Sequence, residues 1–259
     1  MSETITYILI GILGWVTGAL INYLADVLPY RRKLVAPFCL VCEAKFPLAN
    51  YLFLPRACPD CGATRRFRTW LVEVVSIALV IWMWRSPPEG FGFWMGLLIL
   101  AYFGVVVVID MEYRLILHPV SIAGAIGALG LGIWANGLLS ALLGGVAGYG
   151  IMLAFYLLGN LFSKVVSRRR GGVGPGDALG FGDVNLSGVL GLLLGWPLIL
   201  PALFLAILIG GVASLIYMLV MTLLRKYQAL MAIPYGPFLV AGAALLIYFR
   251  EAVLSRLFP

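Results

Sequence analysis

Long apolar runs dominate this chain and constrain its fold more than any other feature. About eight of them are separated by polar stretches, at residues 5–24, 69–84, 92–109, 117–134, 138–162, 184–196, 198–223 and 235–249. A helix of about 20 apolar residues is long enough to cross the ~30 Å hydrocarbon layer of a bilayer. Because lipid offers no hydrogen bonds, the backbone of such a run must satisfy its own polar groups as a helix. The pattern therefore predicts an all-α polytopic membrane protein with about eight transmembrane helices.

Composition supports this prediction and removes two other classes of protein. Of the 259 residues, 63% are hydrophobic and 11% are charged, which excludes a soluble globular protein of this size. The net charge of +7 suggests a nucleic-acid partner, but apolar runs separate the basic residues into clusters that membrane topology explains better, so no nucleic acid is expected. The first run is followed by its basic residues rather than preceded by them, which predicts a retained span and not a cleaved signal peptide.

The positions of the basic residues predict the orientation in the membrane. If the N-terminus faces outward, then of the 18 Lys and Arg only Arg85, Arg250 and Arg256 lie outside. Cytosolic loops of membrane proteins carry an excess of Lys and Arg, and the opposite orientation would invert the ratio. We therefore expect an N-terminus outside and a multi-pass chain whose large polar segment faces the cytosol.

That polar segment, residues 25–68, contains all four cysteines. They are arranged as Cys39-x-x-Cys42 and Cys58-x-x-Cys61, with fifteen residues between the pairs. This spacing predicts a small cytosolic domain that holds a structural zinc ion with four thiolate ligands. A redox pair would need only one CxxC and a thioredoxin-like context, and a reducing cytosol disfavours disulfides. The chain then divides into a first transmembrane helix (1–24), a zinc domain (25–68) and a larger membrane domain (69–259).

Two carboxylates lie at the expected cytosolic ends of different spans. Asp110 ends the third run, and Asp183 opens the sixth within Gly180-Phe-Gly182-Asp183. An ionisable group at a membrane edge is costly and marks a functional site by default, and the glycines allow another backbone, such as that of a substrate, to approach the acid. Two neighbouring carboxyl groups can share a proton, leaving one acid and one base to activate water.

Structural interpretations of the same residues remain open. Asp183 is also a suitable helix N-cap, and Arg114 stands one helical turn from Asp110 and close to Glu112, where it would neutralise either acid. Glu73, just inside the second run, is either an edge residue that reaches toward water or part of a cytosolic cavity.

Membrane carboxylates also belong to a second class of function, the ion-coupled transporters. Transporters place such groups near the bilayer midplane, between repeated halves of the chain. Here both acids lie at one edge, and the two halves of the sequence do not repeat each other. Cleavage of a segment that protrudes from the membrane is therefore the favoured interpretation.

Taken together, these residues resemble the prepilin peptidase family, also called type IV leader peptidases, over nearly the whole chain. The matching positions, in chain order, are Gly18 with Asn22, Leu28-Pro29, the two CxxC pairs, Arg68 with Val72-Glu73, Asp110-x-Glu112-x-Arg114-x-Ile116 with Pro119, Gly180-Phe-Gly182-Asp183-Val184, and Pro234-Tyr-Gly236-Pro237-Phe238-Leu239. Val27, Thr69-Trp70 and Asn185 depart from the usual family pattern, and none of them is one of the two acids.

The resemblance implies a GxGD-type membrane aspartic endopeptidase of the bacterial inner membrane, with residues 69–259 as its peptidase domain. Asp110 and Asp183 would be catalytic, with active-site support from Gly180, Gly182, Glu112 and Arg114. The substrates would be type IV prepilins or type II secretion pseudopilins, whose leader is cut on the cytosolic side. The resemblance also implies N-methylation of the new N-terminus with S-adenosylmethionine, for which the sequence assigns no binding residue.

Overall fold

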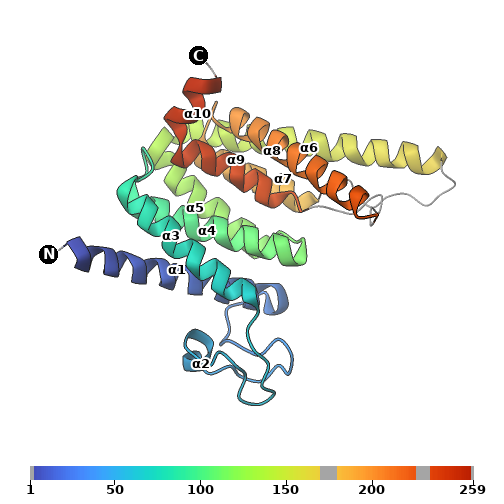
Figure 1. Ribbon diagram of the computed structural model, residues 1–259. Coiled ribbons are helices and arrows are strands. Elements are labelled where there is room, and N and C mark those ends of the chain that lie inside the picture. The colour runs from blue at the N-terminus through green and yellow to red at the C-terminus, as the bar shows by residue number, and fades with distance from the viewer. Residues whose placement is uncertain (1–2, 170–179, 226–233, 258–259) are drawn as a thin grey trace. The chain divides into compact units, whose positions relative to one another are not determined.

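The computed structural model of this chain describes residues 3–169, 180–225 and 234–257. Arg170 and Lys226, two of the basic residues on the expected cytosolic side, lie outside these ranges. Within the described ranges the chain is helical apart from turns and two isolated β-bridges. The predicted all-α fold is thus confirmed (Figure 1).

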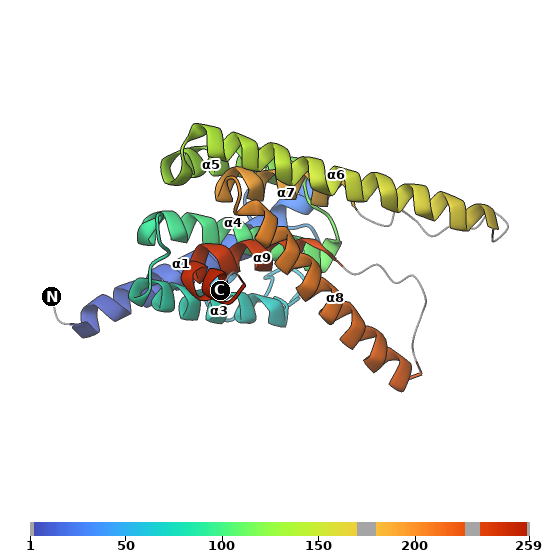
Figure 2. The same ribbon diagram turned by 90° about the horizontal axis from the view of Figure 1, so that it is seen from above.

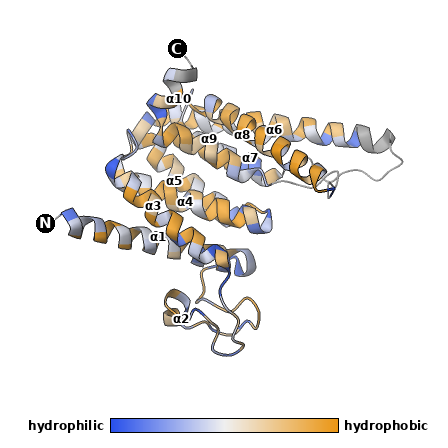
Figure 3. Cartoon of the chain, in the orientation of Figure 1, coloured by the Kyte–Doolittle hydropathy of each residue, from blue (hydrophilic) through white to orange (hydrophobic). Residues whose placement is uncertain are grey.

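Every predicted apolar run contains a helix, in the predicted order. These helices are α1 (Glu3–Arg31), α3 (Phe67–Arg85), α4 (Gly92–Tyr113), α5 (His118–Asn136), α6 (Leu138–Arg169), α7 (Phe181–Leu194), α8 (Ile199–Leu223) and α9 (Gly236–Tyr248). Two shorter helices, α2 (Leu48–Leu52) and α10 (Arg250–Leu257), complete the described part of the chain. Figure 3 shows hydrophobic residues along the long helices and hydrophilic residues toward several of their ends.

The helices differ in length, as the predicted runs do, and not all of them are long enough to cross a membrane. Within the described residues, six helices are long and apolar enough to cross a membrane, namely α1, α3, α4, α5, α6 and α8. The other two expected spans, α7 and α9, have only 14 and 13 residues. Gly195 ends α7 with a φ of 72°, a left-handed backbone conformation that glycine adopts without strain.

The chain divides into two compact units, residues 1–113 and residues 114–259. In the first unit α1 packs against α3 and α4. Two glycines allow the contact with α3 to be close: a Cβ added at Gly14 would lie 2.7 Å from the Cα of Ile77, and one at Gly18 would lie 2.8 Å from the Cα of Glu73. A larger residue at either position would force α1 away from α3.

In the second unit α7 is packed between other helices, in contact with α5, α6, α8 and α9. Both views show α6 running alongside α5 and α7 (Figures 1 and 2). Glycines again set the distance between two helices, here α6 and α7. A Cβ at Gly144 would meet the carbonyl oxygen of Gly191, and a Cβ at Gly148 would meet that of Ser187. The backbones of α6 and α7 therefore touch directly.

The cysteine segment, residues 32–66, connects α1 to α3 in the first unit. Helix α1 continues through Leu24 to Arg31, so this segment begins later than the predicted domain boundary. Its small core consists of Cys39, Phe46, Tyr51 and Cys58. So small a core suggests that other interactions hold the segment together.

Candidate functional site

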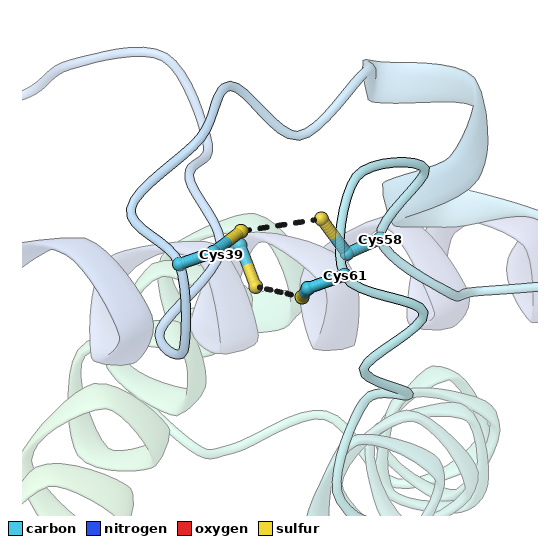
Figure 4. Close-up of side chains that lie close together, drawn as sticks. Cys39, Cys58 and Cys61 are labelled. Atoms are coloured by element: carbon cyan, nitrogen blue, oxygen red, sulfur yellow. Dashed lines mark hydrogen bonds between the residues drawn. The ribbon is translucent and has the colours of Figure 1, made fainter.

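The four cysteines meet at one point, as their spacing predicted. Their Sγ atoms all lie within 4.8 Å of one another, and the Cys39–Cys61 and Cys42–Cys58 pairs are each separated by 3.6 Å. Four sulfurs placed tetrahedrally at the ~2.3 Å Zn–S distance would lie about 3.8 Å apart. Side chains from two separate loops face each other here (Figure 4), and the donors and spacing fit a zinc ion.

Each cysteine pair belongs to a loop with the same backbone hydrogen bonds. The amide of Cys39 donates to the carbonyl of Ala44 at 2.9 Å, and nineteen residues later the amide of Cys58 donates to Ala63 at 2.9 Å. An isolated β-bridge supports each loop, between Phe38 and Lys45 and between Ala57 and Thr64. The segment therefore contains two copies of one metal-binding knuckle.

The thiols within this cluster affect one another's ionisation. Burial raises the pKa of Cys39, but backbone hydrogen bonds at Cys42 and Val41 outweigh it and lower the pKa to about 7. A backbone hydrogen bond at Ala44 lowers the pKa of Cys42, yet the neighbouring thiols, that of Cys61 foremost, raise it to about 12. Like charges this close cannot all ionise unless a cation lies between them. The cluster is thus suited to a divalent metal and ill suited to four free thiolates.

A buried carboxylate connects the cysteine segment to the helices. Asp26, near the end of α1, accepts hydrogen bonds from Tyr51 Oη at 2.6 Å and from Arg65 Nη2 at 2.7 Å, and it also pairs with Arg68. Arg68 in turn contacts Glu112 on α4 at 2.5 Å. Burial, followed by the charge of Asp26, raises the pKa of Tyr51, so its hydroxyl remains a donor. This network joins four helices, α1 to α4, to the second knuckle.

A cavity of about 140 Å³ lies beside this network. Charged side chains line one part of it and apolar side chains the rest; the charged ones are Asp26, Arg65, Arg66, Arg68 and Glu112, and the apolar ones include Phe38, Val41 and Phe46. A cavity of about 150 Å³ accommodates a benzene ring, so this one fits an amino-acid-sized group and not a whole S-adenosylmethionine. Its carboxylates and guanidinium groups match the ammonium and carboxylate of such a group.

Glu73 makes a second buried link, which excludes one of the two interpretations left open by the sequence, that of an edge residue reaching toward water. Its Oε2 lies 2.8 Å from Arg56 Nη2, and both side chains are almost fully buried, at 6% exposure for Arg56 and 4% for Glu73. Trp15 Nε1 also donates to Glu73 at 3.2 Å, and the Arg56 guanidinium lies over the ring of Trp70. Glu73 is therefore the anchor of the cysteine segment on α3 rather than an edge residue exposed to water.

Asp110 lies in the last turn of α4 and is buried within the first unit. The nearby Glu112 pairs with Arg66 and Arg68 rather than with Arg114, which is exposed and follows the helix end with a φ of 53°. The first unit thus contains two neighbouring acids in different roles. Glu112 joins the charged network of the cysteine segment, and Asp110 lies two positions before it in α4 and is buried.

Asp183 lies in the first turn of α7 and is buried within the second unit. It is not the N-cap, because that position belongs to Gly180 and has no side-chain hydrogen bond. A Cβ at Gly180 would lie 3.3 Å from Asp183 Oδ2, and one at Gly182 would lie 2.8 Å from the Cβ of Ile116. Gly182 therefore makes room for a side chain of this protein, while Gly180 leaves space beside the acid. The positive end of the helix dipole stabilises a negative charge at this position.

The sequence interpretation missed Asp26 and Arg65, which the structure places at the centre of the buried network. A carboxylate directly after an apolar run is a signal that could have identified Asp26, by the same argument that identified Asp110. The nineteen-residue repeat of the knuckles was also visible in the sequence, as aligned Cys, Cys and Ala positions. The partner of each charge was not visible, because it depends on how distant segments fold together.

Comparison with protein families gives a match over part of the chain. Residues 97–215, which include Asp110 and Asp183, match the model of the type IV leader peptidase family. No solved structure matches this chain.

Similar proteins cover more of the sequence. A prepilin leader peptidase/N-methyltransferase of Stutzerimonas stutzeri is 31% identical over 221 residues, covering 82% of this chain and 69% of the relative. Proteins of the same name from Aeromonas salmonicida (strain A449) and Aeromonas hydrophila are 27% and 25% identical, covering 78% and 86% of this chain. The chain spans 65% of the length of the A. salmonicida relative and 75% of that from A. hydrophila.

Proposed function

Because this chain belongs to the type IV leader peptidase family, we propose that it is a membrane aspartic endopeptidase that removes the leader from type IV prepilins or type II secretion pseudopilins. The observation that carries the proposal is the pair of buried acids at helix ends, Asp110 in the last turn of α4 and Asp183 in the first turn of α7. A carboxyl group at a helix end can face the edge of the membrane, where a leader is accessible to water.

The proposed chemistry needs two carboxyl groups in opposite protonation states. The ionised one accepts a proton from water, whose oxygen attacks the scissile carbonyl carbon, while the neutral one donates a hydrogen bond to the carbonyl oxygen. The amide nitrogen then receives a proton as the C–N bond breaks. Coupled acids titrate as a pair, so we assign the two roles to Asp110 and Asp183 together. Gly180, Gly182, Glu112 and Arg114 are proposed to support the site.

We also propose that the chain methylates the new N-terminal amine and that zinc holds the cysteine segment in shape. S-adenosylmethionine would supply the methyl group. The cavity of about 140 Å³ beside Asp26 accepts at most one end of this cofactor, and its mixed charges suit the amino-acid end. Four thiolates leave a zinc ion no open position for catalysis, so Cys39, Cys42, Cys58 and Cys61 would have a structural role.

The proposed location is the bacterial inner membrane, with the N-terminus outside and the cysteine segment and both acids facing the cytosol. The distribution of basic residues supports this orientation. Impermeant thiol reagents added from outside should label a cysteine placed at Glu89, between α3 and α4, and should not label one at Lys164, on α6. The reverse pattern would place both acids on the wrong side for a cytosolic substrate.

The decisive experiment is incubation of the purified protein with a prepilin that carries its leader, in the presence and absence of S-adenosylmethionine. Mass spectrometry of the product N-terminus reports cleavage as loss of the leader and methylation as an added methyl group. An intact precursor would contradict the peptidase. A shortened but unmethylated product at saturating S-adenosylmethionine would contradict only the methyl transfer. An ion-coupled transporter, the second class considered from the sequence, would leave the precursor intact and instead move ions in proteoliposomes.

A further inference from the structure

The stretch from Leu48 to Leu54 lies alongside α1 rather than beyond its C-terminal end. The rings of Phe53 and Trp15 lie 5.6 Å apart, and Trp15 is in the middle of the first apolar run of the sequence. At the other end of the segment, Tyr23 Oη donates to the carbonyl of Val35 at 2.7 Å. Figure 1 shows α2 on the side of the cysteine segment toward the middle of α1. Part of the polar segment therefore reaches back along the membrane-spanning part of the first helix.

The outer face of this stretch is apolar. Residues 46–55, with the sequence FPLANYLFLP, contain no charged side chain. Leu48 and Phe53 are largely exposed, and Leu54 is exposed at 76%. Each such side chain costs about 25 cal/mol per Å² of apolar surface left in water. An exposed apolar cluster of this kind marks a surface that something else covers.

Two shallow grooves flank the stretch, where α2 meets the helices. One, of about 320 Å³, lies between Phe53 and Leu54 on one side and Trp15 and Trp70 on the other. The other, of about 330 Å³, lies between Leu48 and Leu52 and the part of α1 from Val16 to Tyr23. Arg56 is the one charged residue in the linings of these two grooves, and it is tied to Glu73. Apolar grooves of this kind fit hydrocarbon chains better than polar ligands.

We propose that residues 48–54 are seated in the interfacial layer of the bilayer, with lipid acyl chains in the two grooves. Continuity with α1 identifies the occupant as lipid, because Ile12, Val16 and Leu20 on the same helix are exposed and lie within the run that crosses the membrane. Trp and Tyr side chains prefer the depth at which hydrocarbon meets head groups, and Trp70, in the first turn of α3, is the Trp of these grooves that fits this depth.

The interfacial layer is also the depth that the backbone permits. Within α2 and its end, the amides of Tyr51 and Phe53 donate to Pro47 and Ala49 at 2.9 and 2.8 Å. Irregular backbone exposed to lipid is not tolerated deeper in the hydrocarbon. The cysteine segment is thus anchored to the membrane on one face and carries its knuckles and charged network on the other, rather than being cytosolic throughout. This proposal does not depend on the peptidase activity.

Photocrosslinking of the full-length protein in phospholipid nanodiscs tests the proposal. A benzophenone amino acid at Leu54 should form adducts with phosphatidylethanolamine or phosphatidylglycerol, detected by mass spectrometry. Val41 is the matched control, since it is apolar and 74% exposed in the same segment but belongs to the first knuckle and lines neither groove. We expect at least a ten-fold higher lipid yield at Leu54 than at Val41, with unchanged zinc content in both variants.

A second measurement needs no substitution. The unaltered protein, reconstituted with a phospholipid that carries a diazirine in its acyl chain, should be labelled on the peptide that contains residues 48–54 and not on residues 39–45. Equal lipid yields at positions 41 and 54, or no label on residues 48–54, would overturn the proposal. Crosslinks from position 54 to a second copy of the chain would overturn it as well, because they would make this face a protein interface.

Discussion

In the first unit, buried pairs of arginine and carboxylate connect the cysteine segment to the helices, whereas in the second unit glycines let the backbones of α6 and α7 touch. Asp26 and Glu73 each bind an arginine from the cysteine segment, Arg65 and Arg56 respectively, while Gly144 and Gly191 leave no space for a Cβ. An ion pair depends on a partner that must itself be folded and, here, on the loops that carry the four cysteines. A glycine contact depends only on shape. The cysteine segment of the first unit should therefore respond to the loss of charge or metal, and the α6–α7 contact of the second unit to added volume.

The largest expected effect concerns the acids, one of which belongs to each unit. Asp110→Asn and Asp183→Asn keep the size and polarity of the side chain but remove its ability to exchange a proton. Each should lower prepilin cleavage by ~10³-fold or more, and the double variant should be no worse than either single one, because residues that act as a unit are lost together. Cleavage rates at matched protein amount check this. Near-normal cleavage by either single variant would refute the dyad.

The next effect is the loss of metal from the first unit. Replacing any of the four cysteines by Ser, for example Cys42→Ser, should reduce zinc from about one ion per chain to near zero, since three thiolates no longer close a tetrahedral site. The cysteine segment should then become sensitive to protease while the second unit keeps its stability. Metal analysis of the purified protein, with Val41→Ser as the neighbouring control, provides the measurement. A zinc-free wild-type protein from metal-replete cells would argue against the site.

Breaking a buried ion pair should lower the free energy of unfolding by several kcal/mol, a smaller effect than the loss of the metal. Glu73→Gln leaves the buried Arg56 guanidinium without a counter-charge, which destabilises by about 3–5 kcal/mol. The double variant Arg56→Met with Glu73→Met removes both charges and should recover most of this loss. Denaturant unfolding in detergent measures the three proteins. If the double variant is no more stable than Glu73→Gln, packing rather than charge explains the link.

In the second unit, stability should depend on the volume of the side chains at the contact between α6 and α7. Gly144→Leu places a side chain against the backbone of Gly191 and Gly195 and should destabilise by about 1–3 kcal/mol. Gly150→Leu is the matched control, because it lies on the same helix and a Cβ there meets nothing within 4 Å. The thermal midpoint of Gly144→Leu should therefore be clearly lower than that of Gly150→Leu. Equal midpoints would mean that α6 and α7 tolerate a wider spacing.

The smallest effect is expected at an exposed ion pair of the first unit. Arg31 and Glu43 lie 3.0 Å apart, but their side chains are 42% and 75% exposed. Solvent screens such a pair, so Glu43→Gln should change stability by less than about 1 kcal/mol. The same unfolding assay measures it. A loss of stability as large as that of Glu73→Gln would show that the contribution of an ion pair to the stability of this unit does not depend on its burial.

The sequence predicted features that depend on local composition and spacing. The eight helices followed from apolar runs, because lipid forces such runs to be helical, and the cysteine cluster followed from ligand spacing. The length of α7 was close to the predicted run, but its bounds lie two to three residues earlier, because hydropathy continues through the turn at Gly195 and Trp196.

Pairings across long stretches of chain could not be predicted in the same way. Asp26 and Arg65 are 39 residues apart in sequence, and many arginines could pair with each acid until the tertiary fold brings particular ones close. Gly182 was expected to admit a substrate backbone, but Ile116 is the group that lies against it. Whether Asp110 and Asp183 act together stays a prediction that the cleavage assay tests.

Helix α7 is shorter than the hydrocarbon layer is thick, and so is its neighbour α9. With 14 and 13 residues and a rise of 1.5 Å per residue, α7 and α9 are about 21 and 20 Å long, and they pack against each other. A hydrocarbon layer of ~30 Å exceeds both, and such hydrophobic mismatch is relieved by thinning of the lipid or by polar groups and water that fill the remainder. Asp183, in the first turn of α7, stands at one end of this short helix. A water molecule and an extended peptide would therefore cross less hydrocarbon to reach this carboxyl group than they would beside any of the six longer helices within the described residues.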